Sequence, residues 1–332
     1  MEPGQMPDAA SKRTLLVGYK AQDLNAELLR GEVLCHTLDI YHSHAIEKTW
    51  GAKTVCSAHL PEGPWDVIKY RTGPALMSGE LSLDLLQEVA GLSPGAKLWG
   101  GRGRSPEVEL DFVGKERDRN ALLEKIKDKP ERKRDFSAKW FASVPGGPKM
   151  EFTSFPGCFC HRRLDEGGLA LAEVVAKDLA ARTAAGGRIR LLDMGCGCGL
   201  VGLLVASAVK GVSLVMVDSH SRAVEAAEVN AKAFGADAKV ILSDDGTPPE
   251  MDGSFDVFVG NPPYYSDYRI ADVFLATAVR ALKTGGTCYT VVKNDAGLKP
   301  VQERHFPSVC VVHRRGYCVL RSVRGEGRAR QC

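Results

Sequence analysis

The sequence predicts an α/β protein with two tandem domains, each a mostly parallel sheet with helices on both faces; an antiparallel hairpin closes the second. Short apolar runs alternate with helix-forming stretches, which is typical of parallel β-α units. The series occurs twice with similar spacings, and WDVIKY in the first half stands where FDVFVG stands in the second. A charged stretch ending in VPGGPK separates the two series and predicts a domain boundary.

The first series predicts a trimmed domain over residues 14–130, after a loose tail at 1–13. The strands are expected at Leu15–Gly18, Val33–Leu38, Lys53–Ala58, Trp65–Tyr70 and Lys97–Trp99, and helices at Ala21–Arg30 and Glu80–Ala90. LLVGYKAQDL occupies the place of the second half's glycine cluster. We therefore predict a degenerate copy kept for scaffolding or substrate docking, with two unrelated α/β domains as the alternative.

The second series predicts a longer domain over residues 151–332, after a helix at Lys115–Lys139 that leads into a linker at 131–150. The strands are expected at Arg190–Met194, Ser213–Asp218, Lys239–Leu242, Phe255–Gly260 and Thr287–Val292. The intervening helices are expected at Leu164–Thr183, Leu200–Val209, Ser221–Phe234 and Asp272–Leu282. Ser308–Val312 and Tyr317–Val323 flank a tight glycine turn and predict the closing hairpin.

Composition excludes several classes of protein. The net charge of +3 is only mildly basic, but residues 115–149 hold 11 Lys and Arg against 6 Asp and Glu, and residues 293–330 hold 9 against 3. Solvated surface and RNA contact are equally compatible with these basic stretches. The ten cysteines include no CxxC pair, which argues against a zinc site, against a secreted disulfide framework and for a reducing compartment.

No apolar run approaches the roughly 18 residues of a membrane span. The first 13 residues lack the apolar core of a signal peptide. We expect an intracellular, cytoplasmic protein, with a mitochondrial or other organelle matrix as the alternative.

The chemistry centres on FDVFVGNPPYYSDY, an apolar strand that stops at Asn261-Pro262-Pro263-Tyr264. Two prolines stiffen the backbone at the carboxyl end of this strand, where open α/β sheets bind ligands. The Asn261 carboxamide oxygen and the Pro262 carbonyl form a pair of acceptors for one NH2 group, and the Tyr264 ring can cover the group that carries it. The alternative is a proline turn with a surface tyrosine.

RLLDMGCGCGLVG predicts a second ligand site, with Asp193 before the alternating glycines Gly195, Gly197 and Gly199. Gly197, Gly199 and Gly202 also satisfy the dinucleotide pattern GxGxxG, so a nicotinamide enzyme is an alternative. However, Asp193 would repel a pyrophosphate and could accept from an ammonium group. S-adenosylmethionine, which has an amino-acid moiety, a ribose and no phosphate, fits better.

Two further loops supply the remaining cofactor contacts. Asp218, at the end of the next strand, and its neighbour Ser219 would bind the ribose hydroxyls. Asp244 and Asp245, after the third strand, would lie beside the adenine amine. The alternatives are a helix cap for Asp218 and plain loop carboxylates for Asp244 and Asp245.

The glycine cluster, Asp218 and NPPY resemble Rossmann-like class I S-adenosylmethionine-dependent methyltransferases that modify planar amino groups. From about residue 150 onward the chain is more narrowly similar to the ribosomal RNA guanine-N2 methyltransferases of the RsmC and RlmG type. FPGCFCHRRLDEGG, VVKNDAG and VVHRRGYCVLRS carry this resemblance. The family commonly has Phe, often followed by His, where this chain has Tyr264-Tyr265.

The resemblance implies methyl transfer from S-adenosylmethionine to the exocyclic N2 of a guanine in ribosomal RNA, with the small subunit favoured. Asn261 and Pro262 would hold the amine and Tyr264 would stack on an unstacked base. The candidate substrate contacts are Tyr265, Arg162, Arg163, Lys293, Arg314 and Arg315. The implied partner is ribosomal RNA or a pre-ribosomal particle, bound by a monomer that needs no metal or membrane. N6-adenine methylation, protein glutamine methylation and a non-catalytic ribosome-assembly role are the alternatives.

Overall fold

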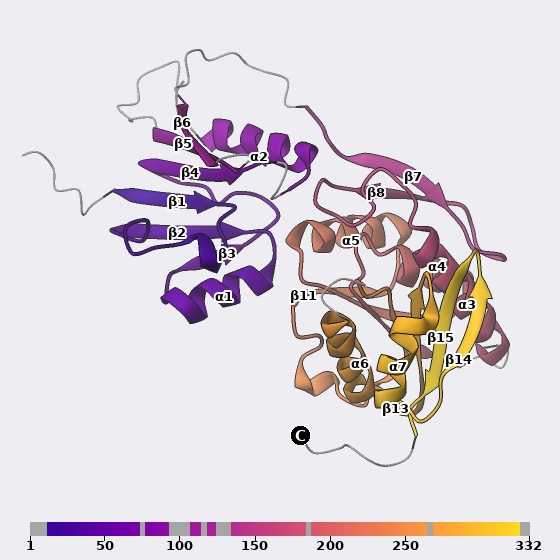
Figure 1. Cartoon of the computed structure of the whole chain (residues 1–332). Coiled ribbons are helices and arrows are strands. Elements are labelled where there is room, and N and C mark those ends of the chain that lie inside the picture. The colour runs from indigo at the N-terminus through magenta and orange to yellow at the C-terminus, as the bar shows by residue number, and fades with distance from the viewer. Residues whose placement is uncertain are drawn as a thin grey trace, which may run out of the picture. The chain divides into compact units, whose positions relative to one another are not determined.

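A six-stranded sheet and a seven-stranded sheet follow one another along the chain in this computed structural model (Figure 1). The structure describes residues 12–73, 77–92, 107–113, 118–123, 134–183, 187–263 and 268–325. The chain divides into two units, Met1–Phe136 and Ser137–Cys332. Each unit contains one of the two sheets.

The first unit has the strand order β3-β2-β1-β4-β5-β6, in which only β6 is antiparallel to its neighbour. Its strands are β1 Arg13–Val17, β2 Glu32–Thr37, β3 Thr54–Cys56, β4 Val67–Thr72, β5 Glu107–Val113 and β6 Asp118–Leu123. Its helices are the short η2 Ala21–Asp23, α1 Ile40–Trp50 and α2 Gly79–Leu92. Leu15 and Val17 pack with α2, and Leu16 packs with α1, so both faces of β1 are buried.

Two predictions for the first unit were wrong. The segment Ala21–Arg30 forms only η2, because the Asn25 side chain accepts from the backbone N–H of Glu27 and Leu28 and makes a turn instead of a helix. Within the predicted helix Lys115–Lys139, residues 118–123 form β6, since β5 supplies a pairing partner that local periodicity does not reveal. The strand expected at Lys97–Trp99 lies outside the described residues.

The second unit has the strand order β11-β10-β9-β12-β13-β15-β14. The strands are β9 Ile189–Met194, β10 Val212–Asp218, β11 Ala238–Leu242, β12 Phe255–Gly260, β13 Leu282–Val292, β14 Cys310–Arg314 and β15 Tyr317–Val323. The helices are α3 Glu166–Thr183, α4 Leu200–Ala208, α5 Ser221–Phe234, the short η3 Pro249–Met251, α6 Arg269–Ala281 and α7 Asp295–His305. Every strand and helix predicted for this half is present, and the hairpin β14–β15 is confirmed.

Helix α7 is an addition that the sequence did not reveal. Gly297 and the internal Pro300 argue against a helix there. The helix is held from outside, because Arg304 and His305 at its end both donate to Asp272 of α6, at 3.1 and 2.9 Å.

The expected linker at 131–150 differs from the structure. Strand β7 (Ala138–Ala142) pairs with β8 (Met150–Ser154) as a separate hairpin of the second unit. Trp140 stacks on the buried Phe152 with ring centroids 5.1 Å apart, and Met150 joins the core formed with α3, α4 and α5. Residues 137–150 are therefore part of the second unit, because the apolar side chains of this hairpin pack into its core.

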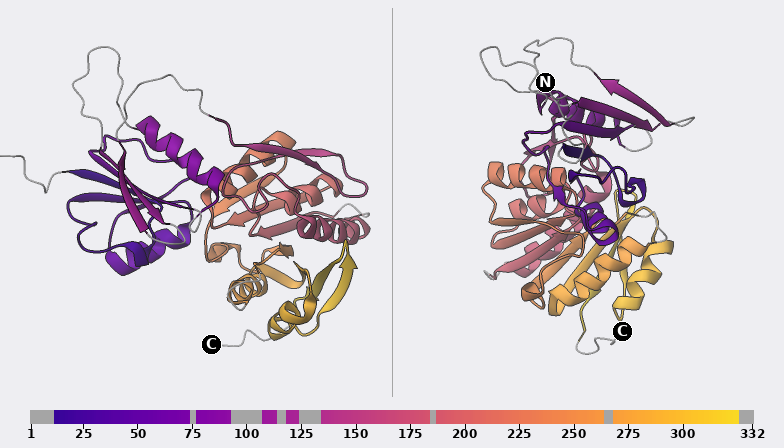
Figure 2. Two further views of the ribbon diagram at one scale, coloured as in Figure 1. Left: turned by 45° about the horizontal axis from the view of Figure 1, so that its top comes forward. Right: turned by 90° about the vertical axis from the view of Figure 1, so that its left-hand side faces the viewer.

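The second sheet has helices on both faces (Figure 2). Leu191 of β9 packs into the core beneath α3, α4 and α5, whereas Leu192 and Met194 pack with α6 and α7. Since both faces are covered, ligands can reach this sheet most readily at the carboxyl ends of its strands. No described helix is long and apolar enough to cross a membrane.

Candidate active site

Strand register gathers the predicted site residues at one edge of the second sheet. Met194, the last residue of β9, pairs with Gly260 of β12 on one side and with Val217 of β10 on the other. The next residues along the three strands are Gly195, Asn261 and Asp218. The edge between β9 and β12 is the topological switch point of this strand order, where open α/β sheets form their binding crevice.

The loop after β9 depends on glycine. Gly195, Gly197 and Gly199 have φ values of +67°, +55° and +84°, a left-handed region that other residues rarely adopt. The backbone N–H of Gly195 donates to the Val217 carbonyl at 2.8 Å, which fixes the loop to the end of β10. The loop therefore presents bare backbone at its glycines, as a closely approaching ligand requires.

The ring of Phe274, on α6, packs against this loop. A Cβ built on Gly195 would lie 2.7 Å from the Phe274 ring, and one built on Gly260 would lie 3.0 Å from it. Phe274 was not among the predicted site residues, and only the spacing of apolar residues along α6 indicated its burial.

Asp218 ties the glycine loop to the end of β10. Its Oδ2 accepts from the Gly197 N–H and its Oδ1 from the His220 N–H, both at 2.9 Å. Asp218 thus lies at the carboxyl end of β10, directly beside the glycine loop. Ser219 is half-buried beside it.

Asp193 is buried and faces α4. Its side chain is 2% exposed, and its Oδ2 accepts from the Gly202 N–H at 2.9 Å. Burial raises the pKa of Asp193 to about 7; the Gly202 hydrogen bond opposes this and the charge of Asp218 adds to it. A Cβ on Gly202 would lie 3.0 Å from Asp193 Oδ2 and 2.8 Å from Leu214, so this glycine allows close helix–strand packing.

The loop after β11 lies against the end of β10, because the Ser243 N–H donates to the Asp218 carbonyl at 3.0 Å. Ser243 Oγ donates to Asp245 Oδ1 at 2.7 Å, which engages the exposed Asp245 in its own turn. Asp244 is half-buried. Of the two acids, Asp244 therefore has the more sheltered position.

Asn261 is held by a residue that the sequence analysis overlooked. Its Nδ2 donates to Asp165 Oδ2 at 2.8 Å, and Asp165 also caps the first turn of α3, its Oδ1 accepting from the Gly167 N–H at 3.0 Å. The signal was present in LDEGG, an acid directly before a helix. Pro262 is buried next to Asn261, whereas Tyr264 and Tyr265 lie outside the described residues.

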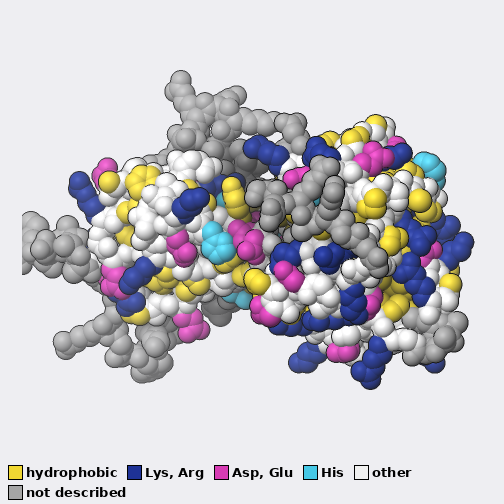
Figure 3. Space-filling view, turned by 90° about the horizontal axis from the view of Figure 1, so that it is seen from below, with side chains coloured by type: hydrophobic (Ala, Val, Ile, Leu, Met, Phe, Trp, Pro, Cys, Tyr) yellow, Lys and Arg dark blue, Asp and Glu magenta, His cyan; other side chains and the backbone are white. Residues whose placement is uncertain are grey.

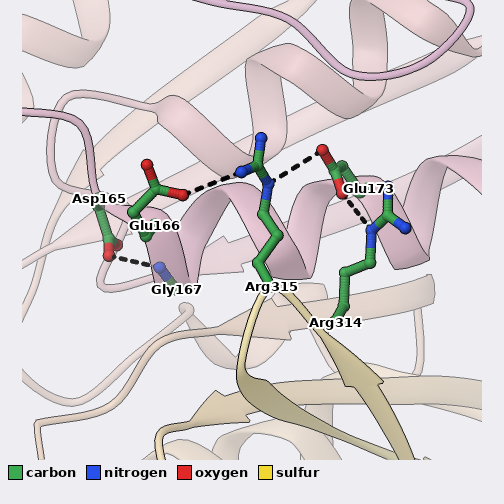
Figure 4. A network of polar contacts seen from close by, with 6 residues as sticks. All are labelled: Asp165, Glu166, Gly167, Glu173, Arg314 and Arg315. Atoms are coloured by element: carbon green, nitrogen blue, oxygen red, sulfur yellow. Dashed lines mark hydrogen bonds and ion pairs between the residues drawn. The ribbon is translucent and has the colours of Figure 1, made fainter.

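Two of the candidate phosphate contacts also form ion pairs within the protein (Figure 4). Arg314 and Arg315, at the β14–β15 turn, both donate to the nearly buried Glu173 of α3. Arg315 also donates to Glu166 at 3.2 Å. These arginines fasten the hairpin to α3.

The other basic candidates face solvent. Lys293, after β13, is exposed, and its Nζ lies 4.2 Å from the centroid of the Tyr317 ring. Arg162 is exposed on the loop that leads into α3. Within the described ranges, no three His, Cys, Asp or Glu side chains are arranged to hold a metal ion.

Known proteins resemble the chain over this site and beyond it. "Ribosomal RNA small subunit methyltransferase C" of Stutzerimonas stutzeri (strain A1501) is 27% identical over 94% of this chain and 95% of that protein. The protein of the same name from Pseudomonas aeruginosa (strain LESB58) is 28% identical over 88% of each chain.

One solved structure resembles the whole chain in fold. It is the T. thermophilus 16S rRNA N2 G1207 methyltransferase (RsmC) in complex with AdoMet and guanosine. Its TM-score is 0.73 at 20% identity, over 98% of this chain and 89% of that one. The family model of the methyltransferase small domain matches residues 149–321, slightly more than half of the chain, which therefore belongs to the methyltransferase small domain family.

Proposed function

We propose that this protein transfers a methyl group from S-adenosylmethionine to the exocyclic N2 amine of a guanine in ribosomal RNA, with small-subunit RNA as the favoured substrate. The observation that carries the proposal is the Asn261 carboxamide, which follows the end of β12 beside the glycine loop and is held there by Asp165. The names of the relatives and the AdoMet and guanosine bound to the similar structure support the same reaction.

The residues at the strand ends fit S-adenosylmethionine. The left-handed glycine loop admits a ligand close to the backbone, as the amino-acid moiety requires, and Asp193 lies at its start. Asp218, with Ser219, offers acceptor oxygens to the ribose hydroxyls, and Asp244 is the better placed acid for the adenine amine. A cluster of carboxylates favours a cationic ligand without phosphates over a dinucleotide. When bound, the cofactor supplies an electrophilic methyl group on a sulfonium.

Asn261 and Pro262 act on the target amine by accepting its hydrogens. The lone pair of an exocyclic guanine nitrogen is delocalised into the ring, so the amine is a weak nucleophile. Two fixed acceptors turn this lone pair out of conjugation and stabilise the positive charge that develops on nitrogen. With the cofactor bound, Asn261 Oδ1 and the Pro262 carbonyl would keep the amine nitrogen aligned for transfer, and the proton lost from that nitrogen would pass to water, since neither carbonyl is basic enough to keep it.

The target guanine must leave its stack to reach this edge of the sheet. We assign the stacking role to Tyr264 and a supporting substrate contact to Tyr265. Arg162 and Lys293 are the proposed phosphate contacts, and Figure 3 shows Lys and Arg side chains gathered on one face of the second unit.

The remaining assignments follow from this substrate. Residues 137–332 carry catalysis, and residues 14–130 form the scaffold or docking domain of a monomer. A ribosomal substrate requires a compartment that contains ribosomes, which is the cytoplasm or an organelle matrix.

The test is transfer of labelled methyl groups to unmodified small-subunit RNA and to partly assembled particles, followed by nucleoside analysis. We expect N2-methylguanosine. The variant Asn261→Ala should bind S-adenosylmethionine like the wild type and lose transfer. The matched control is Asn25→Ala, which removes an asparagine from a turn of the first unit and should retain transfer. N6-methyladenosine as product, or methylation of protein glutamine alone, would refute the guanine assignment.

A further inference from the structure

We propose that Asp165 is the positioning residue of the active site: it sets the orientation of the Asn261 carboxamide so that the oxygen, and never the NH2 group, faces the target amine. This inference rests on the proposed function, because it assumes that Asn261 acts as an acceptor. It adds a residue outside the NPPY motif to the transfer step.

The direction of the hydrogen bond follows from its partners. Asn261 Nδ2 lies 2.8 Å from Asp165 Oδ2, and a carboxylate oxygen can only accept. The NH2 side of the amide must therefore face Asp165, and Oδ1 points to the opposite side. An asparagine without such a partner can turn its amide by 180° and present a donor to the donor hydrogens of the amine. The bond to Asp165 removes that unproductive orientation.

Asp165 is itself fixed at the start of α3. Its Oδ1 accepts from the Gly167 N–H at 3.0 Å, and its backbone carbonyl accepts from the Leu169 N–H at 2.9 Å. Since each carboxylate oxygen has a different partner, the plane of the carboxylate is defined. Asp165 is half-buried, so its hydrogen bond to Asn261 is partly shielded from water.

The two glycines after Glu166 make room for this arrangement. A Cβ built on Gly168 would lie 2.6 Å from Asp165 Oδ2, the atom that binds Asn261. A Cβ built on Gly167 would lie 3.1 Å from the Tyr317 ring. Glycine is unfavourable in the first turns of a helix, so the space that Asp165 and Tyr317 need explains why two glycines stand here.

The helix that carries Asp165 is fastened to the sheet that carries Asn261. At its start, Glu166 and Glu173 bind Arg315 and Arg314 of the β14–β15 hairpin (Figure 4). Further along, the Tyr289 hydroxyl of β13 donates to Asp178 of α3 at 2.9 Å. The distance between Asp165 and Asn261 is therefore set by tertiary contacts at several points along α3.

The experiment exchanges the two side chains. In Asp165→Asn the new amide can keep its oxygen on the Gly167 N–H only by turning its NH2 group to Asn261. Asn261 then reorients to accept, and presents its own NH2 group to the substrate. In the double variant Asp165→Asn with Asn261→Asp, the new amide donates to the new carboxylate, whose second oxygen again faces the amine.

We expect single-turnover transfer to fall about 100-fold in Asp165→Asn, a loss typical of one misplaced polar group at a reacting centre. Cofactor affinity by titration calorimetry and RNA affinity should stay within about twofold, since only the acceptor is reversed. The single variant Asn261→Asp should also be slow, because it places two carboxylates against each other. The double variant should recover at least about tenfold over both single variants.

A helix-capping control separates positioning from folding. Serine is a good N-cap but is too short to hold Asn261, so Asp165→Ser should keep the melting temperature and lose transfer as Asp165→Asn does. Transfer by Asp165→Asn within about threefold of wild type, or a double variant no faster than the single variants, would overturn the positioning role. If the wild type transferred methyl groups without forming N2-methylguanosine, the proposed function would fail, whereas the two results above overturn only the positioning role.

Discussion

Replacing Asp193 by Asn should change how the stability of the second unit depends on pH. The Asp193 carboxyl is 2% exposed and its burial raises the pKa from 3.8 to about 7. The folded state therefore keeps a proton that the unfolded chain has lost between about pH 4 and pH 7. Stability from this group is fully present below about pH 4 and is lost as the pH rises through 7.

The magnitude follows from the size of the pKa shift. Each pKa unit corresponds to about 1.4 kcal/mol, so wild type should lose about 3 kcal/mol from this group between about pH 5 and pH 8. The amide introduced by Asp193→Asn does not titrate in this range. Its oxygen can accept from the Gly202 N–H, and any cost of burying its NH2 group is the same at both pH values. The difference in unfolding free energy between variant and wild type should therefore move by about 3 kcal/mol in favour of Asp193→Asn.

The assay is hydrogen exchange under increasing urea, read from peptides of β9, which report the second unit alone. The matched control is Asp245→Asn, which removes an exposed carboxylate from the neighbouring loop after β11. We expect the control to follow wild type at both pH values. If the difference in unfolding free energy between Asp193→Asn and wild type were equal at about pH 5 and pH 8, this carboxyl would not titrate as a buried acid.

Three further outcomes follow from the site. Asp218→Asn should weaken S-adenosylmethionine binding about tenfold or more by titration calorimetry, because a charged acceptor for ribose is lost; unchanged affinity would exclude that contact. Glu173→Gln should lower the unfolding free energy by about 2 kcal/mol in urea, since Arg314 and Arg315 lose a charged partner; no loss would assign these pairs to solvated surface. Lys293→Gln should reduce the salt dependence of RNA affinity by about 0.7 in the log–log slope, and an unchanged slope would rule out a phosphate contact.

The site was largely predictable where it depends on a local motif. Gly195, Asp218 and Asn261 each end a strand or follow one, and parallel strands bring their carboxyl ends to one edge, so sequence order alone predicts that they meet. Asp165 was not predicted as a site residue because its partner, Asn261, is 96 residues away along the chain. A lone acid before a helix is normally only a cap, and no spacing rule connects it to Asn261.

The basic residues of the closing hairpin have contacts that the sequence did not reveal. A turn with two adjacent arginines near a predicted RNA site favours phosphate contacts, which stay a prediction. Arg314 and Arg315 also bind Glu173, an acid that lies within an apolar stretch of α3 and is almost buried. Charge along the chain predicts surface location, but it does not reveal whether a counter-charge from a distant helix already occupies that surface.

The first unit has the strand order of the second but different residues at the strand ends. Both sheets begin with the order third, second, first, fourth, fifth strand, so the repeat inferred from spacing is confirmed as a repeat of topology. After β1, however, the place of the glycine loop is taken by Tyr19, whose ring is 5% exposed and packs with Leu24 beneath the Arg71 guanidinium. Gly18 keeps a positive φ of +80°, like Gly195, but the two later glycines of the second unit's loop have no counterpart here.

The end of β4 in the first unit also differs from the end of β12. Thr72 and Gly73 stand at the end of the strand that corresponds to β12, where the second unit has Asn261 and two prolines. The apolar alternation of β1 still buries both faces of the sheet, because that pattern is what the fold requires. The residues after the strand ends differ between the two units while the strand order persists. Strand order therefore predicts where a site can form, and only the residues after the strands decide whether one does.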